Sequence, residues 1–175
     1  MHRLSVDEFK AASKLPLIVV LDNVRSLHNV GSVLRSCDAF RVEAVYLCGI
    51  TATPPSAEIH KTALGAEDSV TWKYFAQTTD AIDELHAKGT KVLAVEQVAG
   101  STMLQNLDNE VGTRYAVVLG NEVKGVQQTV VDLCDGCLEI PQFGTKHSLN
   151  VSVAAGIVVW EFAKKIGKGE EVEKR

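Results

Sequence analysis

The sequence predicts an α/β fold, with a single domain, a mainly parallel sheet and helices on both of its faces. Segments with the apolar content of strands alternate along the chain with segments of helical periodicity. The strand-like segments are apolar at nearly every position, as expected for parallel strands buried on both faces. With 175 residues, 46% of them hydrophobic and 23% charged, the chain is long enough for one substantial core.

A short helix, a strand and a longer helix are expected at the start of the chain. Residues 5–8, "SVDE", have the pattern of a capping box, which opens a helix by satisfying its free N–H groups. Pro16 is expected to end this helix, and the apolar residues 17–22 predict the first strand. An amphipathic helix should follow, because apolar residues recur at the i, i+3, i+4 and i+7 spacing at Val30, Val33, Leu34 and Cys37.

The remaining elements follow the same alternation. Strands are predicted at residues 43–50, 69–75, 91–98, 114–120 and 137–141. Helices are predicted after Ser56 as N-cap, at 78–89 ending at Gly89, near 127–133, and as a long last helix to about Ile166. Residues 99–113 are expected to be irregular. The charged tail 167–175 is expected to be frayed.

Composition narrows the function classes. The net charge of -4 gives no overall basic field for nucleic acid. No stretch reaches the ~20 apolar residues of a membrane span, and no hydrophobic leader opens the chain, so a cytoplasmic location is expected. Cys134 and Cys137 form a C-x-x-C pair, but no second pair accompanies it. Two small residues around a turn are the favoured interpretation, and no metal site is predicted.

Polar and glycine-rich segments follow three of the predicted strands. They are "NVRSLHNVGSVLRS" after the first strand, "GNEVKG" after the fifth and "PQFGTKHSLN" after the sixth. Parallel α/β sheets bind ligands beyond the carboxyl ends of their strands. The three segments are therefore expected to form one composite site.

Each segment taken alone leaves alternatives open. "GNEVKGV" lacks the Lys-Ser/Thr continuation of a phosphate loop, so it is either a plain turn or a loop whose backbone approaches a ligand. Asn29, Ser32, Arg35 and Ser36 share a helix face that is either solvated or able to hold a phosphate or carboxylate. "HSLN" can serve as a helix cap, although one cap residue would suffice.

Together, "HNVGSVLRSCDAF", "VVLGNEVKGV" and "LEIPQFGTKHSLNVSVAAGIVVWE" resemble the three ordered motifs of the SpoU (TrmH-like) family of RNA ribose 2′-O-methyltransferases, in the SPOUT superfamily. The resemblance runs from about Leu17 to Lys165. It implies one methyltransferase domain over residues 1–175, with motifs at 22–40, 115–126 and 138–162. It also implies a C-terminal trefoil knot, a homodimer, S-adenosyl-L-methionine as cofactor, and RNA as substrate.

The resemblance also assigns roles to residues by motif position. The catalytic set that it implies is Arg35, Asn29, Glu122, Ser148 and Asn150. The cofactor-binding set that it implies is Leu119, Gly120, Ile140, Ser148, Leu149 and Asn150, with Ile140 and Leu149 acting through their backbone. Because a guanidinium stays protonated, Arg35 is expected to fix the geometry of phosphate and hydroxyl and to stabilise negative charge.

The sequence departs from the family pattern in several places. Arg41 stands where glycine is more common, and Gln142 stands where methionine commonly follows the proline. We expect no separate RNA-binding domain before the motifs, and RNA is therefore expected to contact local basic clusters at Lys10/Lys14, Arg35/Arg41, Lys124, Lys146/His147 and Lys164/Lys165. The compact form favours tRNA over rRNA. The alternatives are a non-catalytic RNA-binding module of the same fold and a small-molecule hydrolase using Ser148 and His147.

Overall fold

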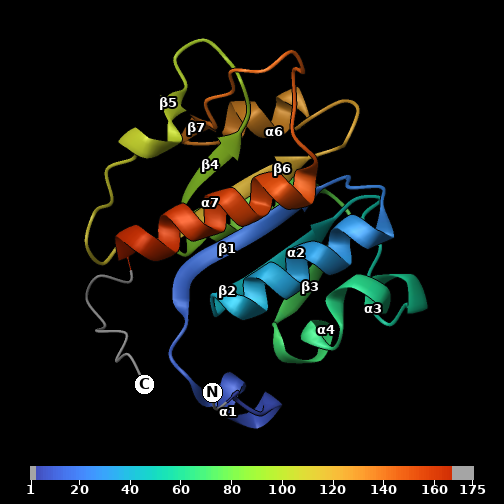
Figure 1. Cartoon of the computed structure of the whole chain (residues 1–175). Coiled ribbons are helices and arrows are strands. Elements are labelled where there is room, and N and C mark those ends of the chain that lie inside the picture. Colours follow the sequence, from blue (N-terminus) through green and yellow to red (C-terminus); the bar gives the residue numbers. More distant parts are fainter. Residues whose placement is uncertain (1–2, 167–175) are drawn as a thin grey trace.

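The computed structural model describes residues 3–166 as a sheet covered by helices on both faces (Figure 1). The sheet has seven strands in the order β3-β2-β1-β6-β4-β7-β5, and every neighbouring pair is parallel. Its strands are β1 (Leu15–Asp22), β2 (Val42–Cys48), β3 (Trp72–Phe75), β4 (Lys91–Val95), β5 (Thr102–Met103), β6 (Tyr115–Gly120) and β7 (Gly136–Glu139). The predicted fold class, one α/β domain with a parallel sheet, is confirmed.

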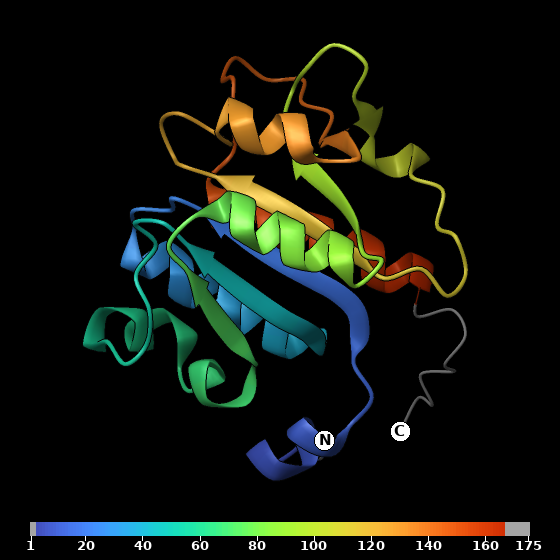
Figure 2. The same cartoon turned by 180° about the vertical axis from the view of Figure 1, so that it is seen from behind.

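Helices α2 (Leu27–Ala39) and α7 (Val151–Ile166) lie across one face of the sheet, beside β1 (Figure 1). Helices α1 (Val6–Ala11), α3 (Ala57–Ala63) and α4 (Ala66–Ser69) contribute to the same core. Helices α5 (Thr78–Ala87) and α6 (Gln128–Leu133) cover the opposite face (Figure 2). None of the helices within residues 3–166 is long and apolar enough to cross a membrane.

The two cores explain why the strands are apolar at successive positions. On β1, Leu17, Val19 and Leu21 belong to the core under α2 and α7, whereas Ile18 and Val20 belong to the core under α5 and α6. Successive side chains of a strand point to opposite faces, so a strand covered on both sides needs an apolar residue at each position.

The expected role of Pro16 was wrong. Helix α1 ends at Ala11, and Pro16 lies inside β1 as its second residue. Leu15 pairs with Val42 and Ile18 with Ala44, so the pairing register shifts at the proline. Proline has no N–H to donate to the ladder and is tolerated at the start of a strand or at such an irregularity.

Two short elements escaped prediction inside the segment expected to be irregular. These are β5 and the 3₁₀ helix η1 (Leu104–Asn106). Lys165 of α7 donates hydrogen bonds to the carbonyls of Leu104, Gln105 and Leu107, which fastens this segment to the last helix. The segment is held by long-range contacts that no local periodicity records.

Arg41 adopts a backbone conformation that favours glycine. It follows α2 with a φ of 51°, in the left-handed region. Only glycine enters this region without steric cost, which accounts for the glycine that the family more often has at this position.

Candidate functional site

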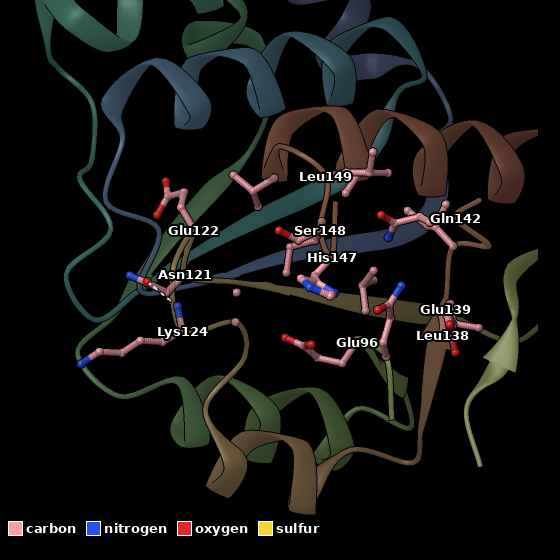
Figure 3. Close-up of a pocket in the computed structure, with 18 of the residues that line it drawn as sticks. Glu96, Asn121, Glu122, Lys124, Leu138, Glu139, Gln142, His147, Ser148 and Leu149 are labelled. Carbon is pink, nitrogen blue, oxygen red and sulfur yellow. Dashed lines mark hydrogen bonds between the residues drawn. The ribbon is translucent and has the colours of Figure 1, made fainter. Parts of the chain in front are cut away.

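A cavity lies at the carboxyl edge of the sheet, beyond the ends of β4, β6 and β7 (Figure 3). It encloses about 340 Å³. Its walls come from residues 95–97, 119–125, 138–140 and 147–149, together with Gln142, Val151 and Ala154. Segments from all over the second half of the chain therefore converge at the edge where parallel sheets bind ligands.

Most residues predicted to bind a cofactor line this cavity. They are Leu119, Gly120, Ile140, Ser148 and Leu149, whereas Asn150 is not among the lining residues. A Cβ added to Gly120 would lie 2.1 Å from backbone atoms of Gly125 and Val126. Glycine is thus required at position 120, where the strand end and the following loop approach each other closely.

The cavity carries more carboxylates than cations. Glu96, Glu122 and Glu139 line it, against Lys124, and the imidazole of His147 lies among them. In Figure 3, Glu96 and His147 point into the cavity, while the side chain of Lys124 extends away from it. A lining of this kind favours a ligand that carries positive charge.

Glu96 was missed by the sequence analysis. Its Oε1 accepts a hydrogen bond of 2.6 Å from the backbone N–H of Val126, and its own N–H donates to the carbonyl of Leu138. A Cβ on Gly125, whose φ is +70°, would lie 2.3 Å from Oε1. The sequence analysis extended this strand to residue 98, which placed Glu96 inside it, whereas β4 ends at Val95 and Glu96 directly follows the strand.

The "GNEVK" loop is a closed turn and not a phosphate loop. Asn121 and Gly125 exchange backbone hydrogen bonds, and Oδ1 of Asn121 accepts from the N–H groups of Val123 and Lys124. Its Nδ2 donates to the carbonyl of Asn23, which ties the loop to the end of β1. The N–H groups of Val123 and Lys124 are already used inside the turn, so they are not free to bind a phosphate.

A hydrogen-bond relay connects the three sequence motifs. Glu122 Oε1 accepts from Asn29 Nδ2 at 3.1 Å, and Asn29 Oδ1 accepts from Asn150 Nδ2 at 3.2 Å. Glu122 also accepts from the backbone N–H groups of Arg25 and Ser26, each at 3.0 Å. The loop after β6 therefore fixes the start of α2, which in turn contacts the start of α7.

The charge of Glu122 is favoured by this arrangement. Partial loss of water acts to raise the pKa of its carboxyl group, but the N–H groups of Arg25 and Ser26, with help from Asn29, outweigh that effect and lower it. The carboxylate is occupied by protein donors. Its geometry suits a residue that positions α2 better than one that exchanges a proton with substrate.

Asn150 is the cap of α7. Its Oδ1 accepts from the backbone N–H groups of Ser152 and Val153 and from the hydroxyl of Ser152 at 2.6 Å. The alternative that "HSLN" contains a helix cap is thus correct for Asn150. The same side chain also donates to Asn29, so the cap serves the relay as well.

Arg35 lies on the exposed side of α2 and does not line the cavity. Among residues 3–166, its guanidinium has no hydrogen bond or ion pair. The buried side of α2 comprises Val30, Gly31, Val33, Leu34 and Cys37, which confirms the predicted apolar stripe. Arg35 is therefore left available for a ligand outside the chain, whereas Asn29 is not.

A buried carboxylate, that of Asp22, holds the end of the loop that walls the cavity. Asp22, at the end of β1, is fully buried and accepts hydrogen bonds from the backbone N–H of Gln127 at 2.8 Å, from its Nε2 at 3.0 Å, and from the hydroxyl of Thr78 at 2.6 Å. It fixes the far end of the loop that follows β6.

Other chemistries find less support. No hydrogen bond joins the side chains of Ser148 and His147 in the part of the chain that the structure describes, so a nucleophile–base pair is not assembled. No cluster of three or more His, Cys, Asp or Glu side chains within residues 3–166 is arranged to hold a metal. Burial raises the pKa of the Cys134 thiol to about 12, and neighbouring Cys137 adds to this shift, which makes a reactive thiolate unfavourable.

Comparison with known proteins identifies relatives over most of the chain. The model of the SpoU rRNA Methylase family matches residues 16–160. A 23S rRNA (guanosine-2′-O-)-methyltransferase RlmB from Nitrosomonas europaea is 36% identical over 156 residues, which cover 89% of this chain and 58% of that protein. The corresponding enzyme of Vibrio cholerae is 31% identical over 161 residues, 92% of this chain and 64% of its own length. The chain thus spans less than two thirds of these curated relatives.

Solved structures share the fold. An AdoMet-bound rRNA methyltransferase from Sinorhizobium meliloti has a TM-score of 0.79 at 29% identity, covering 87% of this chain and 60% of that one. A TrmH/SpoU tRNA modifying enzyme from A. aeolicus has a TM-score of 0.78 at 27% identity, covering 90% of this chain and 78% of that one.

Proposed function

The chain belongs to the SpoU rRNA methylase family, and from this premise we propose that it transfers a methyl group from S-adenosyl-L-methionine to a ribose 2′-hydroxyl of structured RNA. The observation that carries the proposal is the meeting of the three motifs. Glu122, Asn29 and Asn150 form one hydrogen-bond relay at the rim of a cavity suited to a cationic ligand.

The cavity residues fit S-adenosyl-L-methionine, whose sulfonium and ammonium groups are positively charged. Leu119, Gly120, Ile140 and Leu149 would contact it through backbone groups, and Gly120 also lets the loop that walls the cavity pack closely against the end of β6. Ser148 lines the same wall, and Asn150 would act indirectly by holding the start of α7. The carboxylates of Glu96 and Glu139 supply the complementary charge.

When bound, the cofactor supplies a methyl group already activated on a positive sulfur. The protein then has to hold the ribose hydroxyl in line and to stabilise the negative charge that develops on its oxygen. Arg35 is the group assigned to this task, since its guanidinium is exposed and can bind a phosphate with two prongs. Asn29 and Glu122 orient α2, which carries Arg35.

Ribosomal RNA is the better-supported substrate class. The sequence analysis favoured tRNA, but the curated relatives described above act by name on 23S rRNA. One solved relative is named as a tRNA modifying enzyme, at a lower identity of 27%. The tRNA preference is therefore unsupported, and we propose rRNA first. An enzyme acting on ribosomal RNA would work in the cytoplasm.

The homodimer is also a proposal. Val153, Ile157 and Trp160 form an exposed apolar stripe on α7, with 51%, 38% and 52% of their surfaces accessible, and Trp160 packs on Phe40 of α2 at 5.7 Å between ring centroids. Residues at i, i+4 and i+7 share one side of a helix. A second copy of the chain could bury this stripe and double the RNA-binding surface.

We further propose that the C-terminal region forms a trefoil knot. Strands β4 and β6 pair directly, so residues 96–114 between them make a closed loop. Strand β7 pairs with β4 on one side and with β5, part of that loop, on the other. The chain reaches β7 from α6 on one face and leaves to α7 on the opposite face (Figures 1 and 2). This path supports threading through the loop.

A methyl-transfer assay tests the function. The protein is incubated with labelled S-adenosyl-L-methionine and, separately, with 23S rRNA, 16S rRNA and total tRNA lacking native modification. We expect label in an alkali-resistant dinucleotide, because a 2′-O-methyl group blocks cleavage at its own phosphate. Donor binding without transfer to any RNA would contradict catalysis and favour the RNA-binding module. Label restricted to tRNA would contradict the substrate class alone.

A further inference from the structure

A second concavity adjoins the cofactor cavity. It is formed by the loop after β1, the loop after β2, Asn121 and residues 123–129, and we call it the outer groove. Its volume is about 910 Å³, within the range of small-molecule and nucleotide sites. Asn121, Val123, Lys124 and Gly125 line both the outer groove and the cofactor cavity. The turn after β6 is therefore the wall between them.

The two concavities have opposite charge. The outer groove is lined by two cations, Arg25 and Lys124, and none of its lining residues is Asp or Glu. This is notable in a chain of net charge -4. Both cations are exposed, and neither side chain forms a hydrogen bond or ion pair with residues 3–166. A polyanion that avoids the carboxylates of the cavity would find its counter-charge here.

Apolar surface lies between these cations. Ile50 and Val123 are 63% and 82% exposed, although both are large aliphatic residues. Exposed aliphatic side chains beside unpaired cations suit a nucleotide, whose phosphate is charged and whose base offers a flat apolar face. The combination is less suited to an inorganic anion, which would gain nothing from Ile50.

We propose that the outer groove binds a nucleotide of the RNA substrate next to the nucleotide that is methylated. Arg25 and Lys124 hold its phosphate, and its base packs against Ile50 and Val123. The shared wall places this nucleotide beside the methyl donor. The inference rests on the proposed function, which identifies RNA as the substrate. Binding of RNA to the outer groove can nevertheless be measured without catalysis.

A competing basic surface is less suited to RNA. Lys10, Lys14, Lys73, Lys88 and Arg114 line a groove on the α5 side of the sheet. Lys73 and Lys88 both pair with Glu84, Arg114 pairs with Glu43, and Lys14 donates to carbonyls at the end of α1. Most of these cations already have partners inside the protein, whereas the side chains of Arg25 and Lys124 have none among the described residues.

The test compares Arg25→Ala, Lys124→Ala and the double variant with Lys91→Ala, a charge-matched control at the amino end of β4. Affinity for a short rRNA fragment is measured by fluorescence anisotropy over a range of salt, and S-adenosyl-L-methionine binding by calorimetry. Each single variant should weaken RNA binding roughly 5- to 10-fold and reduce the salt slope by about one phosphate contact. Donor affinity of Arg25→Ala should stay within about twofold of wild type, because Arg25 lines only the outer groove.

A second variant guards against misfolding. Ile50→Glu replaces an exposed side chain, so the fold should survive. Because its carboxylate repels phosphate, it should weaken RNA binding at least as much as Arg25→Ala does. RNA binding of Arg25→Ala and Ile50→Glu equal to that of Lys91→Ala would overturn the inference. If wild-type protein methylates RNA while these variants also do so normally, only the outer groove is wrong. If wild type binds RNA through Arg25 but never methylates it, only the proposed function is wrong.

Discussion

Arg35 and the three residues of the relay differ in how their polar atoms are used. Asn29, Glu122 and Asn150 use their polar atoms on one another, whereas the Arg35 guanidinium has no partner in the described chain. Arg35→Ala should therefore bind S-adenosyl-L-methionine almost normally and lose methyl transfer about 10²- to 10³-fold, the usual loss for one preorganised charge at a reaction centre.

Calorimetry measures the binding of S-adenosyl-L-methionine, and single-turnover transfer to RNA measures the loss of methyl transfer. Both are run on the same preparation of Arg35→Ala. Arg35→Lys should recover little of the methyl-transfer rate, since an ammonium cannot form the bidentate hydrogen bonds of a guanidinium. Wild-type turnover by Arg35→Ala on saturating RNA would show that Arg35 is only a surface residue. Loss of donor binding by a folded Arg35→Ala would place it in the cofactor cavity instead.

Glu122 should act through its charge on the start of α2. Its hydrogen bonds lower its pKa below the ordinary value of 4.5, so its contribution to stability is complete above about pH 4.5 and is lost as the pH falls through the lower folded pKa. The backbone N–H resonances of Arg25 and Ser26 should report this titration by NMR, with a midpoint below 4.5. In Glu122→Gln the transition should vanish, because an amide does not titrate. A midpoint at or above 4.5 in wild type would contradict the assignment.

At the scale of elements, two glycines in the packed helices have opposite roles. A Cβ on Gly31 of α2 would lie 2.1 Å from Thr62 Oγ1 and 2.3 Å from the carbonyl of Ile59, so Gly31 lets α2 and α3 touch. A Cβ on Gly156 of α7 would meet only Ser36 Oγ, at 3.9 Å.

The two alanine variants should therefore shift the free energy of unfolding in opposite directions. Gly31→Ala should destabilise by roughly 1–3 kcal/mol through overpacking. Gly156→Ala should stabilise by about 0.5–1 kcal/mol, because alanine loses less backbone entropy than glycine in a helix. Urea denaturation of both measures the difference, and the same sign for both would contradict this packing.

Elements with a strong local signal were predictable, and those made by distant contacts were not. The cap at Ser5, the stripe of α2 and the end of α7 near Ile166 follow from neighbours in sequence, and all three were predicted correctly. Strand β5, η1 and the inclusion of Pro16 in β1 depend on partners far along the chain. The same distinction holds for the candidate site. That three loops form it was predicted from the ends of the strands. That Asn29 bonds to both Glu122 and Asn150 required the fold.

For the whole molecule, the proposed dimer depends on the apolar stripe of α7. Trp160→Lys places a charge where a second copy would pack, so light scattering should show a monomer at micromolar concentration, against a dimer for wild type. Lys91→Ala, on β4 and outside the stripe, serves as control and should remain dimeric. A wild-type protein that is monomeric and fully active would remove the need for a partner.

The proposed knot has a mechanical signature. Pulled by handles at its two ends, the unfolded chain should extend less than the ~3.3–3.6 Å per residue available to an open chain, because a tightened knot retains residues. Single-molecule force spectroscopy measures this length, with an unknotted protein of similar size as reference. Extension to the full length of 175 residues would exclude a knot.

The Asn150–Asn29–Glu122 relay also joins two binding equilibria. Asn150 follows the cavity residue Leu149, and Asn29 lies on the helix that presents Arg35. Under the proposed function, a donor that restrains Asn150 would also restrain Asn29 on α2, and thermodynamic linkage would make this effect on RNA binding reciprocal. Whatever factor the donor adds to RNA affinity, RNA must add to donor affinity. Under the proposed function, cooperative loading of the two substrates, in either order, would follow from two shared amide hydrogen bonds.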